Sequence, residues 1–384
     1  LAALSLASYL ALRQRSRKWL FVLMVFSVLY FGFWRKGCIC PIGAIQNVTV
    51  ALSDGSYVMP LTVLAFFFLP LLFALFFGRV FCAAVCPLGG VQDLVAIKPL
   101  RLPAVVSTAL GILPHVYLAF AILLAACGAG FVICRYDPFV SFFRLSGTFF
   151  ILTLGVATLI LGAFVARPYC RFFCPYSVLL DWASRFSWKH VTVTPDDCIQ
   201  CRLCERACPF DAIVVPSAGQ VPEGREAGKR RLALIVALFP VLILGGAWAG
   251  SGLAIPAGLM SPTVRLALDI QATETAPARR TGGPRATTPE VVAFRSAGKP
   301  TAELYREAEV LRRRFRTGSW LLGGFIGLVA AGKLMALSVA RQRRDYEPDR
   351  ASCLSCGRCF LYCPREHERL KGVPLTSKDA NRKA

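Results

Sequence analysis

The stretch that decides the fold is CIQCRLCERACP at residues 198–209, which spaces four cysteines as C-x2-C-x2-C-x3-C before a proline. A second stretch, CLSCGRCFLYCP at residues 353–364, repeats this spacing. It is the spacing of bacterial ferredoxins with two iron–sulfur clusters, in which the fourth cysteine of each run ligates the cluster of the other run. Zinc is the alternative for four cysteines, but zinc ligands usually come as separated pairs. The two runs therefore predict a two-cluster ferredoxin that is split along the chain.

On this pattern each predicted 4Fe–4S cluster takes cysteines from both runs. One predicted set consists of Cys198, Cys201, Cys204 and Cys363. The other consists of Cys353, Cys356, Cys359 and Cys208. Such sharing requires that the two runs end on the same side of any membrane that the chain crosses.

The composition between these runs is that of an integral membrane protein. The chain has 384 residues, of which 55% are hydrophobic and 17% are charged, whereas a soluble protein carries about 25% charged residues. About 20 apolar residues cross the hydrocarbon core. The predicted spans are 19–34, 58–77, 108–127, 148–166, 232–254 and 318–340, with a partial span at 1–12. The shorter apolar stretches 41–52 and 87–97 predict re-entrant or interfacial helices.

The net charge of +22 comes from basic residues beside the apolar segments, which indicates membrane orientation and not nucleic-acid binding. If the six spans alternate, one side of the membrane receives the basic segments 13–18, 78–107, 167–231 and 341–344. Basic residues cluster on the cytoplasmic side of membrane proteins, so this side is predicted to be the cytoplasm. Arginines at 312–316 conflict with this topology, although long connections obey the rule poorly. Both ferredoxin runs are then cytoplasmic, and residues 232–340 form a membrane hairpin inserted between them.

The other eight cysteines alternate between the two predicted faces of the membrane. The cytoplasmic set, which predicts an iron–sulfur cluster, is Cys82, Cys86, Cys170 and Cys174. The outer set, which predicts a further cluster, is Cys38, Cys40, Cys127 and Cys134. The alternatives are structural cysteines in the first set and a disulfide such as Cys127–Cys134 in the second, because the outer compartment is oxidising.

An internal repeat supports these two sets. CPIGAIQN at residues 40–47 parallels CPLGGVQD at residues 86–93, and CPY at residues 174–176 is a weaker third copy. The first two copies fall on opposite predicted faces, which is typical of inverted repeats. Proline suits the first turn of a helix, so each copy places a cysteine at a helix N-terminus, where the helix dipole favours an anionic group.

The predicted fold class is a mainly α, polytopic membrane protein with inverted repeats and re-entrant half-helices, plus a split cytoplasmic ferredoxin domain of α+β type. The predicted parts are a membrane domain (1–190), the first ferredoxin half (191–217), a transmembrane hairpin (218–350), the second ferredoxin half (351–366) and a basic tail (367–384). Within the outer loop 255–317, residues 271–300 are expected to be extended and residues 301–316 to form a surface helix. Two ionisable residues, His115 and Lys333, lie inside predicted spans. His115 is expected to have a structural or hydrogen-bonding role, and Lys333 is expected to snorkel to the cytoplasmic interface. A quinol or proton role is the alternative for either residue.

The two C-x3-C-P motifs at residues 82–87 and 170–175, together with both ferredoxin runs, resemble the NosR/NapH-type membrane polyferredoxins. The resemblance covers roughly residues 19–216 and 345–365. It implies membrane-bound electron transfer that involves periplasmic redox systems. Some members carry a covalent-flavin domain ahead of the membrane part, so FMN is expected in an upstream domain or a partner. The outer cysteine set and the insertion 255–317 depart from the family pattern.

The expected protein is an electron-transfer component of a membrane oxidoreductase complex, with four iron–sulfur clusters, in a bacterial inner membrane. Its expected partners are lipid, a cytoplasmic electron carrier or enzyme, and a periplasmic redox partner that carries a flavin in some relatives. No nucleic acid is expected. Two alternatives stay open, namely a quinol dehydrogenase that feeds a periplasmic reductase and an oxidase-assembly protein that reduces a metal.

Overall fold

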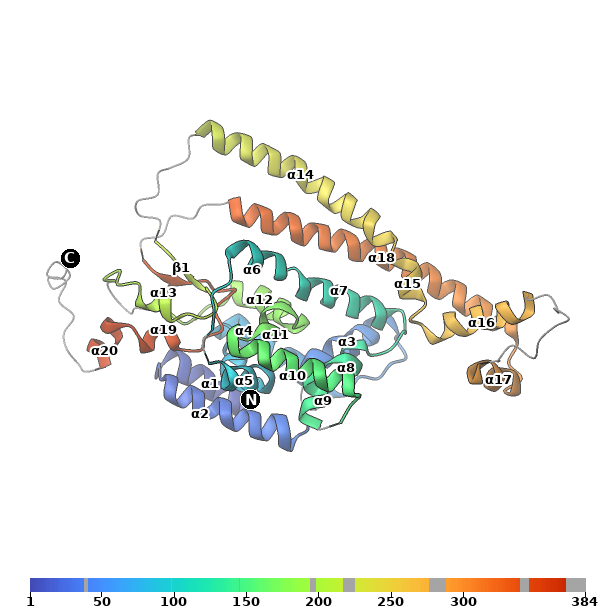
Figure 1. Ribbon diagram of the computed structural model, residues 1–384, viewed down its shortest axis with the longest axis horizontal. Coiled ribbons are helices and arrows are strands. Elements are labelled where there is room, and N and C mark those ends of the chain that lie inside the picture. Colours follow the sequence, from blue (N-terminus) through green and yellow to red (C-terminus); the bar gives the residue numbers. More distant parts are fainter. Residues whose placement is uncertain are drawn as a thin grey trace.

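The protein is mostly helical and includes several long apolar helices (Figure 1). The computed structural model describes residues 1–37, 41–97, 99–144, 146–193, 198–216, 225–275, 288–338 and 345–370. Among them, four helical segments are long and apolar enough to cross a membrane, namely Arg17–Trp34, Ala104–Ala126, Glu226–Ser251 and Thr301–Ser338. This finding supports the prediction of a membrane protein with several spans.

The first two of these segments are composite. The first joins α2 (Arg17–Ser27) to the π-helix η1 (Val28–Trp34), and the second joins α6 (Ala104–Leu110) to α7 (Leu113–Ala126). A fifth candidate is the pair α9 (Pro138–Arg144) and α10 (Phe149–Phe164), which is bent by 102°. Two further apolar helices, α1 (Ala2–Leu12) and α4 (Leu61–Phe77), are shorter.

The inserted hairpin consists of α14 (Arg225–Ser251) and α18 (Thr301–Ser338), which pack along each other (Figure 1). Small residues let the two backbones approach closely. A Cβ atom added at Gly246 would lie 2.5 Å from the carbonyl oxygen of Gly323, and one added at Gly250 would lie 2.6 Å from the Cα of Gly323. The hairpin is therefore held by backbone-to-backbone contact between glycines.

The helix predicted at 301–316 is confirmed, and it continues without a break into the predicted span at 318–340 as helix α18. The extended conformation predicted for 271–300 is wrong where the segment is described, because it contains the end of α16 (Pro262–Thr275) and all of α17 (Pro289–Ser296). Residues 276–287 of that segment lie outside the described residues. Helix α15 (Ala254–Gly258) precedes α16. Leu304, Ala308 and Val291 are buried together with α16, so tertiary packing overrides the local Pro, Gly and Thr content.

The two ferredoxin runs meet in a small α+β unit at one end of the molecule (Figure 1). The first run supplies α13 (Leu203–Ala207) and β1 (Ile213–Val214). The second supplies β2 (Glu347–Pro348), α19 (Arg358–Leu361) and α20 (Pro364–Leu370). Strands β1 and β2 pair antiparallel, with Ile213 opposite Pro348. Helices α16 and α17 lie at the opposite end of the molecule.

Short helices that begin at proline lie between the long ones. The stretches predicted to be re-entrant or interfacial are α3 (Pro41–Ser53) and α5 (Pro87–Val95). The π-helix η2 (Phe81–Val85) precedes α5, and α11 (Pro168–Phe172) precedes α12 (Pro175–Arg185). The remaining short helix is α8 (Val132–Tyr136). Proline fits the first turn of a helix because that position needs no hydrogen-bonded N–H, and this places the preceding residue at the helix N-terminus.

Candidate iron–sulfur sites

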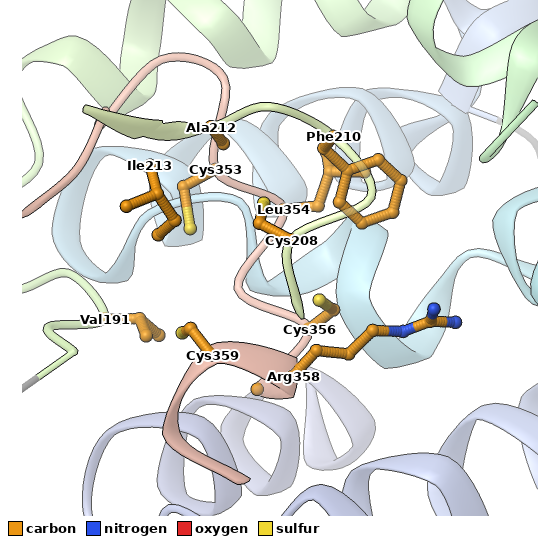
Figure 2. Close-up of a pocket in the computed structure, with 11 residues that line it drawn as sticks. Val191, Cys208, Phe210, Ala212, Ile213, Cys353, Leu354, Cys356, Arg358 and Cys359 are labelled. Carbon is orange, nitrogen blue, oxygen red and sulfur yellow. The ribbon is translucent and has the colours of Figure 1, made fainter. Parts of the chain in front are cut away.

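Four cysteines from both ferredoxin runs surround one hollow between the strands and α19 (Figure 2). Its lining includes the cysteines of one predicted set, Cys208, Cys353, Cys356 and Cys359. The hollow measures about 330 Å³, part of it open to solvent. Four thiols from two separate runs on one hollow are the donor set that a 4Fe–4S cluster requires.

The other ferredoxin set also gathers side chains from both runs. Cys204 interacts electrostatically with Cys198, Cys201 and Cys363. Burial raises the pKa of Cys204 to about 11, and these neighbouring thiols raise it too. In the first set, burial raises the pKa of Cys353 to about 12. Free thiols here stay protonated near neutral pH, so binding of a cluster must release their protons.

The cysteines of the C-x3-C-P motifs form a third group, inside the main hydrophobic core. All four are buried, and Cys174 interacts with Cys82, Cys86 and Cys170. Cys86 precedes α5 and Cys174 precedes α12, and both have extended backbones with ψ of 115° and 112°. A residue before proline favours this conformation. We call these four residues the membrane cysteine set.

These three groups differ from a site for one metal ion. Among the residues that the structure describes, no group of three or more His, Cys, Asp or Glu side chains is arranged to hold a single ion. A zinc site needs four sulfur atoms at about 2.3 Å from one point. In a 4Fe–4S cluster four thiolates ligate separate irons, and the all-cysteine donor set of each group fits this kind of cluster.

A buried carboxylate joins the membrane part to the ferredoxin unit. Asp93 in α5 binds Arg167 through two contacts, Nε to Oδ1 at 3.0 Å and Nη2 to Oδ2 at 2.9 Å. Arg17 and Arg358 approach the same carboxylate at 3.6 and 3.7 Å. Burial alone raises the pKa of Asp93, but the three guanidinium groups hold it down to about 2. We call these four residues the Asp93 cluster.

The Asp93 cluster touches the cysteine groups on both sides. Arg167, whose side chain is 0% exposed, donates from Nη1 to the carbonyl oxygen of Cys82 and lies 5.8 Å from the centre of the Phe210 ring. Arg17 donates from Nη1 to the carbonyl oxygen of Cys356 at 2.9 Å. The Arg167 backbone is left-handed (φ 47°), a conformation that costs about 1–2 kcal/mol in a residue other than glycine.

A second buried arginine makes the same kind of connection. Arg79 donates from Nη1 to the carbonyl oxygen of Ala351 at 3.0 Å, and it interacts with Cys82 and Cys174. From the sequence alone, Arg79 and Arg167 are only orientation signals. The signal that could have found them is their spacing, because each stands three residues before the first cysteine of a C-x3-C-P motif.

The outer set is described only in part, since Cys38 and Cys40 lie outside the described residues. Cys134, which is exposed, follows the start of α8. Its sulfur lies against α3, where a Cβ atom added at Gly43 would come within 2.9 Å. Cys127 is buried at the end of α7 and packs with Leu123 and Phe315. A cluster on this set therefore stays a prediction.

The two ionisable residues inside spans have backbone partners. Lys333 donates from Nζ to the carbonyl oxygen of Thr108 at 3.4 Å. The Nδ1 of His115 lies 3.1 Å from the carbonyl oxygen of Gly111. The His115 contact agrees with the hydrogen-bonding role expected from the sequence, and the snorkelling expected of Lys333 stays a prediction.

Comparison with known proteins bears on the same cysteines. A 4Fe-4S binding domain matches residues 59–103 and 147–193, which contain the whole membrane cysteine set. Another 4Fe-4S binding domain matches residues 191–214, which contain the first ferredoxin run. The chain is thus a 4Fe-4S binding protein with helices that are able to span a membrane.

The family follows from a curated relative. Uncharacterized protein MJ0750 of Methanocaldococcus jannaschii is 30% identical over 197 residues, which are 50% of this chain and 82% of the relative. The chain belongs to the same protein family as this relative. The NosR/NapH-type resemblance remains a prediction.

Two further relatives match shorter parts. Uncharacterized protein MJ0749 of the same organism is 31% identical over 83 residues, which are 22% of this chain and 34% of that protein. "Putative electron transport protein YccM" of Escherichia coli K12 is 33% identical over 70 residues, which are 18% of this chain and 19% of that protein. The chain therefore spans about a third and a fifth of their lengths. No solved structure matches the chain at a significant level.

Proposed function

We propose that this chain is an iron–sulfur electron-transfer subunit of a membrane oxidoreductase complex. When bound, 4Fe–4S clusters supply one-electron transfer. The 4Fe-4S binding domains and the relative named as an electron transport protein support an iron–sulfur electron-transfer role. We propose further that electrons pass between a cytoplasmic carrier or enzyme and a periplasmic redox partner.

The observation that carries the proposal is the connection between the cysteine groups. Arg17, Arg79 and Arg167 join the ferredoxin unit to the membrane cysteine set through buried contacts. Fixed positive charge beside a cysteine-ligated group favours its more negative, reduced form. We therefore assign these arginines two roles, to hold the ferredoxin unit on the membrane part and to favour the reduced state of both neighbouring sites.

We assign the cluster ligands to the cysteines whose side chains the structure brings together. Two ferredoxin clusters take the two cross-run sets, and the membrane cysteine set takes a third. On the outer side the partner would be a periplasmic redox protein, with or without FMN. We propose that the ferredoxin unit faces the cytoplasm of a bacterial cell, because the predicted topology puts the basic segments and both ferredoxin runs on one side.

Transmembrane reduction tests the proposal. The anaerobically purified protein is reconstituted into vesicles that enclose a redox dye, and a membrane-impermeant reductant is added outside. We expect the dye to be reduced in vesicles that contain the wild-type chain, and to stay oxidised with Cys170→Ser or in protein-free vesicles. Equal rates in all three preparations would contradict transfer across the membrane.

A further inference from the structure

Two buried glutamines occupy the same place in the repeated sequence. Gln46 and Gln92 each follow a Cys-Pro pair by the same number of residues, and each side chain is 0% exposed. The side-chain oxygen of Gln92 accepts the backbone N–H of Tyr169 at 3.0 Å. That of Gln46 accepts the backbone N–H of Ile133, also at 3.0 Å. Tyr169 and Ile133 both stand immediately before a cysteine.

The amide of Gln92 also reaches a sulfur atom of the membrane cysteine set. Its Nε2 donates to Cys170 Sγ at 3.4 Å and to the carbonyl oxygen of Leu88 at 2.9 Å. The orientation of the amide is fixed, because the backbone N–H of Tyr169 can only donate and must face the oxygen. Hydrogen bonds to sulfur are among the features that set the reduction potential of a cluster.

The amide of Gln46 is oriented in the same way but lacks such a partner. Its oxygen must face the N–H of Ile133, and its Nε2 has no hydrogen-bond partner among the described residues. A buried donor without a partner costs about 1–3 kcal/mol. The thiol of Cys134 lies against Gly43, which stands one turn before Gln46 on α3. The unpaired Nε2 of Gln46 therefore lies on the turn of α3 against which the Cys134 thiol packs.

The carboxylate of Asp137, four residues after Ile133, takes its hydrogen bonds from other donors. Asp137 precedes Pro138 as Cys174 precedes Pro175. It accepts the N–H groups of Phe139 and Val140 at 2.8 and 3.2 Å, and the Tyr169 hydroxyl at 2.6 Å. Because Tyr169 is also the residue held by Gln92, these bonds join the surroundings of Cys170 to the segment that carries Cys134.

Resting on the proposed function, we propose that Gln46 donates a hydrogen bond to a sulfur atom of a second membrane iron–sulfur site that takes Cys134 as a ligand. Gln46 is then a positioning residue whose oxygen fixes the Cys134 segment and whose nitrogen sets the potential of the site. Its role matches that of Gln92 at the membrane cysteine set. An N–H donor stabilises the more negative, reduced state, so its loss lowers the potential.

The test compares Gln46→Leu with Gln92→Leu in the full chain, labelled with ¹⁵N only at glutamine side chains. Pulsed EPR of the reduced wild type should show weak ¹⁵N couplings from two glutamines. Gln46→Leu should remove one coupling and lower the midpoint potential of one cluster, and Gln92→Leu should do the same at another cluster. Cys134→Ser should lower the iron content per chain, and this result does not depend on the folding of the glutamine variants.

Two results would overturn the inference and leave the proposed function standing. In one, the wild type shows a single ¹⁵N coupling, Gln92→Leu removes it, and Gln46→Leu changes no midpoint potential. Gln46 would then only hold the Ile133 N–H. The other is an unchanged iron content in Cys134→Ser. A wild type with no membrane cluster at all would instead contradict the proposed function.

Discussion

The membrane cysteine set and the segment around Cys134 are built with the same devices and differ in their charges. Each lies beside a helix that begins at a Cys-Pro pair, and each is held by a buried glutamine. Only the membrane cysteine set is buried and backed by arginines that reach the ferredoxin unit. The repeat supplies a scaffold, and the charge that differs within it is the carboxylate of Asp93, whose counterpart in the first copy is the uncharged Asn47. Asp93 gathers the arginines that join its copy to the ferredoxin unit.

The largest effect is expected from removing a ligand of the membrane cysteine set. Cys170→Ser should abolish one 4Fe–4S cluster and lower the iron content by about four atoms per chain. Iron and acid-labile sulfide measurements on anaerobically purified protein check this. Ser184→Ala near the end of α12, where the hydroxyl donates to the Asp181 carbonyl oxygen, is the control and should keep the full content. Equal iron in Cys170→Ser and wild type would remove this set from the list of cluster sites.

The next effect concerns the charges that distinguish the two regions. Arg167→Gln removes one member of the Asp93 cluster and leaves Arg17 and Arg358 near the carboxylate. Loss of one partner of a buried ion pair costs about 3–5 kcal/mol, and we expect the lower end because two guanidinium groups remain. Thermal unfolding in detergent measures the loss.

Arg313→Gln is the control for this substitution, because its pair with Glu309 is exposed. Such a pair contributes about 0–1 kcal/mol. If the two variants unfold at the same temperature, the Asp93 cluster does not hold the ferredoxin unit in place.

The pH dependence of Asp93→Asn sharpens the role of the same carboxylate. The pKa of Asp93 is held at about 2, below its ordinary value of 3.8. A depressed pKa gives stability that is complete above the ordinary value and is lost as the pH falls through the folded-state value. The stability difference between wild type and Asp93→Asn should therefore stay constant from about pH 8 to about pH 5. A difference that shrinks over this range would mean that burial, and not the arginines, controls the pKa.

The smallest effect on stability is expected from adding a methyl group at Gly89 or at Gly43, which occupy equivalent positions of the repeat. In Gly89→Ala the new Cβ would lie 3.1 Å from Arg167 Nη1 and 3.4 Å from the Cys82 carbonyl oxygen, both fixed by the Asp93 cluster. Overpacking of this kind costs about 1–3 kcal/mol. In Gly43→Ala the new Cβ would meet the Cys134 sulfur, which is exposed and can move. Thermal unfolding should rank Gly89→Ala as the more destabilised, and the reverse order would show that the Cys134 side is the more tightly packed.

Local spacing made part of this molecule predictable. Cysteine spacing identified the ferredoxin runs, and proline after cysteine marked the starts of α5 and α12. The Asp93 cluster could not be predicted, because Arg17, Asp93, Arg167 and Arg358 come from four distant segments that only tertiary packing joins. The continuity of α18 was missed because its polar first half and apolar second half have different compositions.

Iron and acid-labile sulfide per chain in the anaerobically purified wild type test the central claim most directly. Three four-iron clusters, two in the ferredoxin unit and one on the membrane cysteine set, predict at least about twelve iron atoms per chain. A second membrane site would raise this number further. A value of about eight, which the two ferredoxin clusters alone would give, would contradict a cluster within the membrane part.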